Sequence, residues 1–441
     1  MSDLPSVSRW EVIKNRKRIL QNPLPFHSEN FERFGDSFRV KIGAPSGVIF
    51  TRDPLIIKHI LQKNHKNYQK SKLQTEDLAK YIGKGLLTSN GEHWRVHRRM
   101  IQPAFHKKKL EGLLSIMNKA IESELEQIKP GHEIDVYRLM SDLAFQVVAQ
   151  SLFSRADIRK RMVRLQEITE SNQRMLIREM RQPYLNWWFR LSGKIEGHLK
   201  MAREGREILN GIIEERISSG LQKDDLLDML LEARYEDGTP MPRQQLLDEV
   251  LILFTAGHET TANALSFSLF NIASNGEVQK KLHKEMAAVD LNSVAIPDLF
   301  KQLPYTKCCI EESLRLHPPA YVIDREAKDE DSIGGLELRK GSLVLMSVYE
   351  LHRHTDFWSD AERFRPERFQ EKLPKDYAQY YYPFGAGPRM CIGNNFAMYE
   401  MIITLYRILS RYRISTPLAE IEINPLISLK PKTVPIGFER I

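Results

Sequence analysis

The long middle of the chain constrains the fold most, because it is built of helix-forming periodicity. From Leu110 to Leu316, apolar residues recur at spacings of three and four with few internal glycines or prolines. Breaks fall where turn-forming residues gather, at 218–225 (SSGLQKDD), 236–242 (EDGTPMP) and 274–277 (SNGE). This pattern predicts a large body of long helices.

Short strands are predicted toward both ends. Phe38–Gly43 and Gly47–Thr51 alternate and contain β-branched residues, and 331–349 (DSIGGLELRKGSLVLMSVY) has a similar character. Pro54 is placed to begin a helix, and a further helix is expected after Cys391. The 441 residues contain no long linker, repeat or low-complexity tract. We therefore expect a mainly α fold with a minor β part, in a single domain covering 1–441.

The composition is that of an ordinary globular protein, with 42% hydrophobic and 28% charged residues. The amino terminus lacks the apolar stretch of a signal peptide, and no run approaches the ~18 to 20 apolar residues that a membrane span needs. Three cysteines, with Cys308 and Cys309 adjacent, cannot build a disulfide framework. We expect a soluble, cytoplasmic protein without a membrane anchor.

The net charge is +8, and the densest basic stretch is 93–109 (HWRVHRRMIQPAFHKKK). A solvated helix face is the plainest interpretation of such a run. No nucleic-acid-binding motif accompanies it, so an acidic protein partner ranks above DNA or RNA.

A polar cluster interrupts the apolar helix predicted over 246–270. Gly257 to Thr261 (GHETT) stand at its centre, where polar groups are costly unless they are bonded or used. A kink with threonine hydroxyls bonded to carbonyls one turn earlier would explain Gly and Thr-Thr alone. The neighbouring carboxylate of Glu259 favours proton delivery instead. A zinc HExxH site is excluded, because its second histidine position holds Ala262.

A carboxylate with two arginine partners is predicted ahead of the last cysteine. Glu312 and Arg315 stand three apart on a helix and can pair on one face. Arg368, in the downstream FRPERF segment, can bind the same carboxylate. This set is predicted to fix the loop that precedes Cys391.

Cys391 lies in a glycine-rich turn, 383–395 (PFGAGPRMCIGNN). A phosphate-binding loop is excluded because Pro388 and Arg389 follow its glycines, and a dinucleotide fingerprint is excluded by Met390. Zinc would need ligands nearby, and a nucleophilic cysteine, which stays possible, would need a histidine base. A single thiolate ligand to haem iron fits best, with glycines for close approach, Arg389 for a propionate and a following helix directed at the sulfur.

These motifs together resemble the cytochrome P450 family of haem-thiolate monooxygenases. The cysteine signature of that family is matched by Phe384, Gly387, Arg389, Cys391, Gly393 and Ala397. Its oxygen-activation signature is matched by Ala256, Gly257, Glu259, Thr260 and Thr261, its Glu-Arg-Arg set by Glu312, Arg315 and Arg368, and its Trp-x-x-x-Arg helix by Trp94 and Arg98. The four motifs occur in family order over about 90–400.

The resemblance implies a role for each matched residue. Cys391 would be the axial ligand of haem b (iron protoporphyrin IX), approached closely at Gly393. Glu259 and Thr260 would relay protons toward bound O2. Four residues would anchor the propionates: Trp94, Arg98, Arg325 and Arg389.

The resemblance also implies insertion of one oxygen atom from O2 into an organic substrate, by hydroxylation or oxidative O-demethylation. Electrons would come from a separate ferredoxin or flavodoxin and its NAD(P)H-dependent reductase, docked near Arg95, Arg99 and Lys107–Lys109. The alternative function is a non-catalytic thiolate-haem sensor or binding protein, which has no need of Glu259 and Thr260.

The substrate is open between fatty acids, terpenoids or steroids, and small methoxylated or oxygenated compounds. Tyr321 and Asp324 are candidates for polar pocket residues. Trp187, Trp188 and Phe189 line an access channel in one interpretation and a packed cluster in the other.

Overall fold

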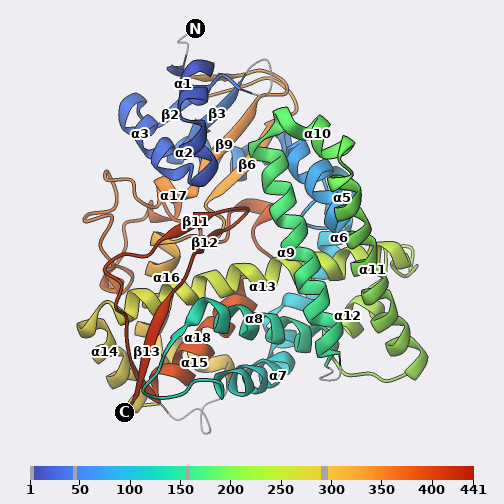
Figure 1. The fold of residues 1–441 in the computed structure, drawn as a ribbon, viewed down its shortest axis with the longest axis vertical. Coiled ribbons are helices and arrows are strands. Elements are labelled where there is room, and N and C mark those ends of the chain that lie inside the picture. Colours follow the sequence, from blue (N-terminus) through green and yellow to red (C-terminus); the bar gives the residue numbers. More distant parts are fainter. Residues whose placement is uncertain (1–3, 43–46, 155–157, 290–295) are drawn as a thin grey trace.

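The computed structural model describes residues 4–42, 47–154, 158–289 and 296–441, and helices dominate it as predicted (Figure 1). Its α-helices are α1 (Arg9–Lys14), α2 (Arg16–Gln21), α3 (Leu24–Phe34), α4 (Pro54–Lys58), α5 (Ala79–Ile82), α6 (Gly91–Ile101), α7 (Lys107–Leu125), α8 (Val136–Phe153), α9 (Arg159–Arg181), α10 (Asn186–Leu191), α11 (Lys194–Ser219), α12 (Leu226–Glu232), α13 (Arg243–Ala273), α14 (Gly276–Ala287), α15 (Leu299–Gln302), α16 (Pro304–Leu316), α17 (Val348–Leu351) and α18 (Asn394–Leu409). The predicted breaks coincide with the gaps after α11, before α13 and between α13 and α14.

The strands confirm a smaller β part built from both ends of the chain. They are β1 (Ser6–Val7), β2 (Ser37–Val40), β3 (Val48–Thr51), β4 (Tyr68–Gln69), β5 (Glu133–Asp135), β6 (Val322–Ala327), β7 (Asp331–Ile333), β8 (Leu336–Leu338), β9 (Leu343–Ser347), β10 (Tyr412–Ser415), β11 (Ile423–Pro425), β12 (Leu429–Pro431) and β13 (Pro435–Arg440). The six-stranded sheet has the order β1-β2-β3-β9-β6-β4, in which β3 runs parallel to β9. Gly43, the end of one predicted strand, lies outside the described residues.

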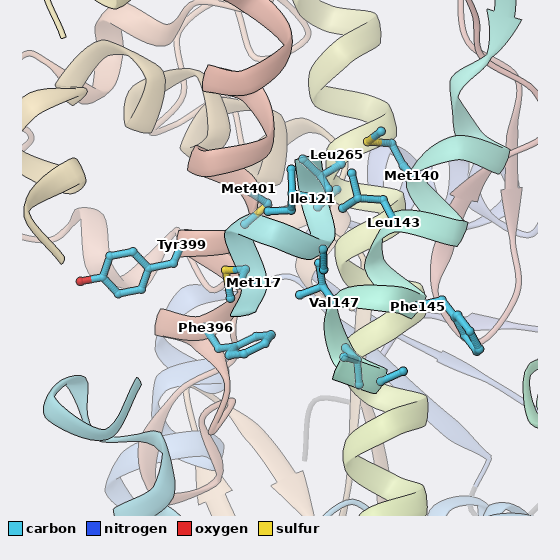
Figure 2. Packing of buried hydrophobic residues seen from close by; sticks show 14 of the residues in the cluster. Met117, Ile121, Met140, Leu143, Phe145, Val147, Leu265, Phe396, Tyr399 and Met401 are labelled. Carbon is cyan, nitrogen blue, oxygen red and sulfur yellow. The ribbon is translucent and has the colours of Figure 1, made fainter. Parts of the chain in front are cut away.

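Helix α13 crosses the helical body and supports the elements around it (Figure 1). Figure 2 shows apolar side chains of α7, α8, α13 and α18 meeting in one buried cluster, among them Met117, Ile121, Leu143, Leu265 and Met401. Truncating such a buried side chain to alanine costs about 2–5 kcal/mol. This packing holds α13 and α18, and hence the polar residues that α13 carries, in fixed positions.

Among the described residues, every helix is too short or too polar to cross a lipid bilayer. Three short helical turns matter for the site: η1 (His59–Lys63), η4 (Gln102–Phe105) and η9 (Gly387–Arg389). The organisation of the chain as a single domain stays a prediction.

Candidate functional site

The Cys391 turn is held in a shape that requires glycine. Gly387 has φ of +68°, and a Cβ at this position would overlap the carbonyl oxygen of Leu61 in η1. The backbone N–H of Cys391 donates to the carbonyl of Phe384 at 2.9 Å, which closes the loop. Helix α18 begins three residues later, at Asn394. The glycine-rich sequence therefore serves close packing of the loop against η1 as well as the placement of Cys391.

The Cys391 side chain is exposed to solvent, although many protein atoms lie around it. This burial raises the pKa of the thiol, while a hydrogen bond from the Gly393 N–H and the charge of Arg98 act in the opposite direction. A bound metal ion deprotonates a coordinating thiol. Within the described ranges, no three His, Cys, Asp or Glu side chains gather as a metal cluster.

Arg389 and Trp94 lie against each other beside this turn. The Arg389 guanidinium carbon is 4.2 Å from the centre of the Trp94 ring. Its nitrogens donate to the carbonyl of Ser89 at 3.0 Å and to Oδ1 of Asn90 at 3.2 Å. Burial, with repulsion from Arg325, lowers the pKa of Arg389 to about 10. The structure therefore brings together residues predicted to anchor the haem propionates, from α6, from β6 and from the cysteine turn.

This region also holds a buried lysine that sequence reasoning missed. Lys70 donates its ammonium protons to the carbonyls of Leu86 and Leu87. Burial and the nearby Arg325 and Arg389 lower its pKa well below the usual range. No sequence signal distinguishes this lysine from a surface one. The carboxylates of Asp324 and Glu249 oppose this shift in the pKa of Lys70, and the two arginines fit a carboxylate-bearing ligand such as haem.

The middle of α13 is less completely buried than the turns on either side of it. Between Leu246 and Ile272 every residue of this helix is buried except Leu253, Ala256, Gly257, Glu259 and Thr260. The spacing of 253, 256, 257 and 260 places these residues on one helical face. The two predicted catalytic residues therefore lie on the half-buried part of this helix.

The two predicted catalytic side chains have different partners. The Thr260 hydroxyl donates to the carbonyl of Ala256 at 2.7 Å, so the back-bonding expected of a helical threonine is present. The Glu259 carboxylate accepts a hydrogen bond from the Ser428 hydroxyl at 2.9 Å. Ser428 follows β11 and was not anticipated from the sequence, because the contact joins residues 169 positions apart.

His258 points into the protein core. Its Nε2 lies 3.1 Å from the Ser141 hydroxyl, and its ring packs beside Phe145 and Phe254. Burial lowers the pKa of His258 to about 4, so the ring is neutral at physiological pH. It is a core histidine, in agreement with the exclusion of a zinc site.

The predicted carboxylate with two arginine partners is confirmed. Arg315 donates to both oxygens of Glu312 at 2.7 and 2.9 Å, and Arg368 donates to the same carboxylate at 2.9 Å. Arg315 also donates to the carbonyl of His352 at 2.8 Å, and the ring of His352 accepts the N–H of Tyr382 at 2.8 Å. The network thus reaches from α16 to the chain that enters the Cys391 turn.

The candidate substrate-contacting residues are placed unevenly. Trp187 and Trp188 are 65% and 46% exposed, whereas Phe189 is buried, so the three do not form one packed cluster. The Tyr321 hydroxyl donates to the carbonyl of Leu426 at 3.0 Å. The Asp324 carboxylate accepts from the Ser71 N–H at 3.3 Å and from the Gln74 amide. Both polar candidates are therefore engaged with protein.

Comparisons with known proteins agree with this geometry. A family model described as Cytochrome P450 matches residues 5–437. Putative cytochrome P450 132 of Mycobacterium bovis is 30% identical over 400 residues, covering 86% of this chain and 85% of that protein. Cyclooctat-9-en-7-ol 5-monooxygenase of Streptomyces melanosporofaciens is 30% identical over 407 residues, covering 90% and 86%. Protein LUTEIN DEFICIENT 5, chloroplastic, of Arabidopsis thaliana is 28% identical over 406 residues, covering 87% and 68%.

Proposed function

Because the chain belongs to the cytochrome P450 family and is a cytochrome P450 monooxygenase, we propose that it binds haem b through Cys391 and oxygenates an apolar organic substrate. One observation carries this proposal: Cys391 lies near Arg98, in a turn that brings Arg389 close to Arg325 and to the buried Lys70. When bound, the haem supplies the binding and reductive activation of O2.

The protein's part in holding the haem follows from the chemistry of these groups. The Cys391 thiolate is the metal ligand, and the Gly393 N–H that bonds to its sulfur stabilises the negative charge. Trp94 supports the guanidinium of Arg389 from its ring face. We assign the charges of Arg98, Arg325 and Arg389 to the haem carboxylates, since charge-assisted hydrogen bonds stabilise buried ions.

We assign proton delivery to Glu259 and Thr260. A half-buried carboxylate such as that of Glu259 can accept a proton from solvent and release it again. The Thr260 hydroxyl donates its only proton to the carbonyl of Ala256. Its oxygen can therefore accept a hydrogen bond from a water molecule. Thr260 thereby orients the water that receives the proton from Glu259.

A turnover experiment tests this function. With a surrogate ferredoxin and reductase, the purified enzyme is expected to insert one atom of ¹⁸O from labelled O2 into product. E259Q and T260A are expected to lower product per electron by about 100-fold, the usual contribution of a positioned proton donor, with peroxide released instead. Haem binding without product from any substrate in the panel below would contradict the proposal and favour a sensor.

We propose a terpenoid- or steroid-like substrate. The engagement of Tyr321 and Asp324 with protein leaves two fewer polar groups to bind a hydrophilic compound. One relative is named as a cyclooctat-9-en-7-ol 5-monooxygenase, which supports a cyclic, mainly apolar skeleton. A panel of terpenoids, steroids, fatty acids and methoxylated aromatics is to be screened for the iron spin shift. Spin shifts seen only with fatty acids and methoxylated aromatics would contradict this assignment.

We propose that a ferredoxin or flavodoxin docks where α7 begins. Phe105, just before α7, lies against Gly393 of the cysteine turn, and Lys108 and Lys109 are exposed. Arg95 pairs with Glu92 and Arg99 pairs with Glu236, so the two lysines are the better candidates for binding an acidic partner.

Charge reversal tests the docking surface. K108E/K109E is expected to slow reduction by the partner about tenfold at low salt and to weaken its salt dependence. K160E/K200E, on exposed positions of α9 and α11, is the matched control. It should change neither the rate of reduction by the partner nor the salt dependence of that rate. Equal rates in the two double variants would place docking elsewhere.

A further inference from the structure

The hairpin formed by β11 and β12 touches the proposed proton donor. The Ser428 hydroxyl, in the turn of this hairpin, donates to Oε1 of Glu259 at 2.9 Å. The side-chain amide of Asn263, one helical turn after Glu259 on α13, donates to the Ser428 oxygen at 2.9 Å. Ser428 is 5% exposed and Asn263 is fully buried. Two buried polar side chains, Asn263 and Ser428, therefore form a short hydrogen-bonded chain that ends at the half-buried Glu259.

The direction of these hydrogen bonds is fixed when Glu259 is ionised. An ionised carboxylate only accepts, and a serine hydroxyl has a single proton to donate. Ser428 must then donate to Glu259, so the Asn263 amide must turn its NH₂ group toward Ser428. In this arrangement Oδ1 of Asn263 is buried and accepts no hydrogen bond from any described residue. A buried acceptor without a partner is unfavourable and needs an explanation.

A second arrangement of the same three groups gives this oxygen a partner. When Glu259 is protonated, its O–H can donate to Ser428, whose own proton becomes free. Rotation of the Asn263 amide then presents Oδ1 to that proton, and its NH₂ group takes the position that Oδ1 held before. No proton leaves Ser428 or Asn263 in this exchange. Ser428 therefore donates to the ionised carboxylate of Glu259 and can accept from the protonated one.

Ser428 is a firmly placed donor because the hairpin is fixed by other elements. The carbonyl of Leu426 accepts the Tyr321 hydroxyl at 3.0 Å, and the carbonyl of Pro425 accepts the guanidinium of Arg181 from the end of α9. The Leu429 N–H donates to the carbonyl of Pro319 at 2.9 Å. A donor held in this way restricts the carboxylate it binds.

Other ionisable groups surround the trio. On α8, burial raises the pKa of Tyr137, as do the negative charges of Glu259 and of Glu170 on α9. Lys430 of β12 lies 5.7 Å from the centre of the Tyr137 ring. His258, the neighbour of Glu259, points into the core. Ser428 is the group that contacts the carboxylate directly in the part of the chain that the structure describes.

We propose that Ser428 is a positioning residue for Glu259, which orients the carboxylate for proton transfer and, with Asn263, provides partners for both of its protonation states. The proposal rests on the proton-delivery role given to Glu259 above. It requires that Ser428 act through Glu259 and not through the stability of the hairpin.

A double-mutant cycle separates these possibilities. The variants are S428A, S428T, E259Q and S428A/E259Q, with S268A as the control, because Ser268 is buried on α13 and bonds only to the carbonyl of Ala264. The first readout is the peroxide released per electron, measured with the compound that gives the largest spin shift in the panel above. The second, independent of turnover, is deuterium exchange of the backbone at 426–429 in the resting, haem-loaded protein.

We expect S428A to raise peroxide release per electron about tenfold, because it removes a hydrogen bond to a charged group. S428T keeps a hydroxyl at this position and should return peroxide release to the wild-type level. In the E259Q background, S428A should add nothing. Exchange at 426–429 should stay at the wild-type rate in S428A and in S268A, because other contacts fix the hairpin; acceleration in S428A would overturn the proposal. The proposal is overturned if S428A releases no more peroxide per electron than the wild type. It is also overturned if S428A/E259Q releases more peroxide than E259Q. If E259Q releases no more peroxide per electron than the wild type, the role given to Glu259 is wrong and this proposal is overturned with it. If E259Q releases more peroxide but S428A does not, only the role of Ser428 is overturned.

Discussion

Replacing Glu312 by alanine is expected to destabilise the protein far more than removing an equivalent surface carboxylate. Glu312 and Arg315 are completely buried, and Glu312 accepts hydrogen bonds from Arg315, Arg368 and the N–H of Arg365. E312A leaves two buried arginines without their carboxylate. Breaking a buried ion pair in this way costs about 3–5 kcal/mol.

The size of the effect can be converted into a melting shift. At ~2.1 cal/mol/K per residue, the 441 residues give an unfolding entropy of about 0.9 kcal/mol/K. The loss therefore lowers Tm by about 3–5 °C. Because the network also fixes the chain that enters the Cys391 turn, the variant should retain less haem after purification.

The matched control is E277A. Glu277 and Lys280 form an ion pair with the same spacing of three at 2.8 Å, but both side chains are exposed. Exposed pairs contribute about 0–1 kcal/mol, so Tm should fall by no more than about 1 °C. Differential scanning calorimetry at several scan rates measures both variants. If E312A melted like E277A and kept its haem, the structural role given to this network would be wrong.

Three further predictions concern single residues of the site and core. G387A should fail to incorporate haem, because its side chain meets the Leu61 carbonyl; G341A, which shares a positive φ but has open space around it, should lose only about 1–2 kcal/mol and bind haem normally. Burial lowers the pKa of His258 from 6.5 to about 4. The contribution of the neutral ring to the free energy of unfolding is therefore fully present above pH 6.5, and this free energy should fall by about 3 kcal/mol as the pH falls toward 4. Urea titrations at several pH values should show a weaker pH dependence of the free energy of unfolding in H258F. R389Q should release haem to an acceptor protein about tenfold faster, through loss of a charge-assisted hydrogen bond, and an unchanged rate would remove Arg389 from the haem-binding set.

Local patterns predicted the parts of the fold that depend on neighbours in the sequence. Apolar periodicity indicated the long α13, and the spacing of Glu312 and Arg315 indicated their pairing because residues three apart meet on one helical face. The glycines around Cys391 marked a turn with special backbone geometry.

Long-range contacts between common residue types were not predictable. Lys70 is an ordinary lysine in the sequence, and only the folded chain shows that it is buried beside Arg325 and Arg389. Ser428 meets Glu259 across 169 residues, through a hairpin whose position is set by tertiary packing. Trp187 and Trp188 are compatible with a core or a surface by composition, and the structure places both at the surface.

The absorption spectrum of the reduced, CO-bound protein tests the central claim most directly, because the position of the Soret band reports whether the haem ligand is a thiolate. The wild-type protein is predicted to show the long-wavelength Soret band of thiolate ligation, and C391S is predicted to lose that band. A wild-type spectrum without the band, or a C391S spectrum that keeps it, would contradict the assignment of Cys391 as the haem ligand.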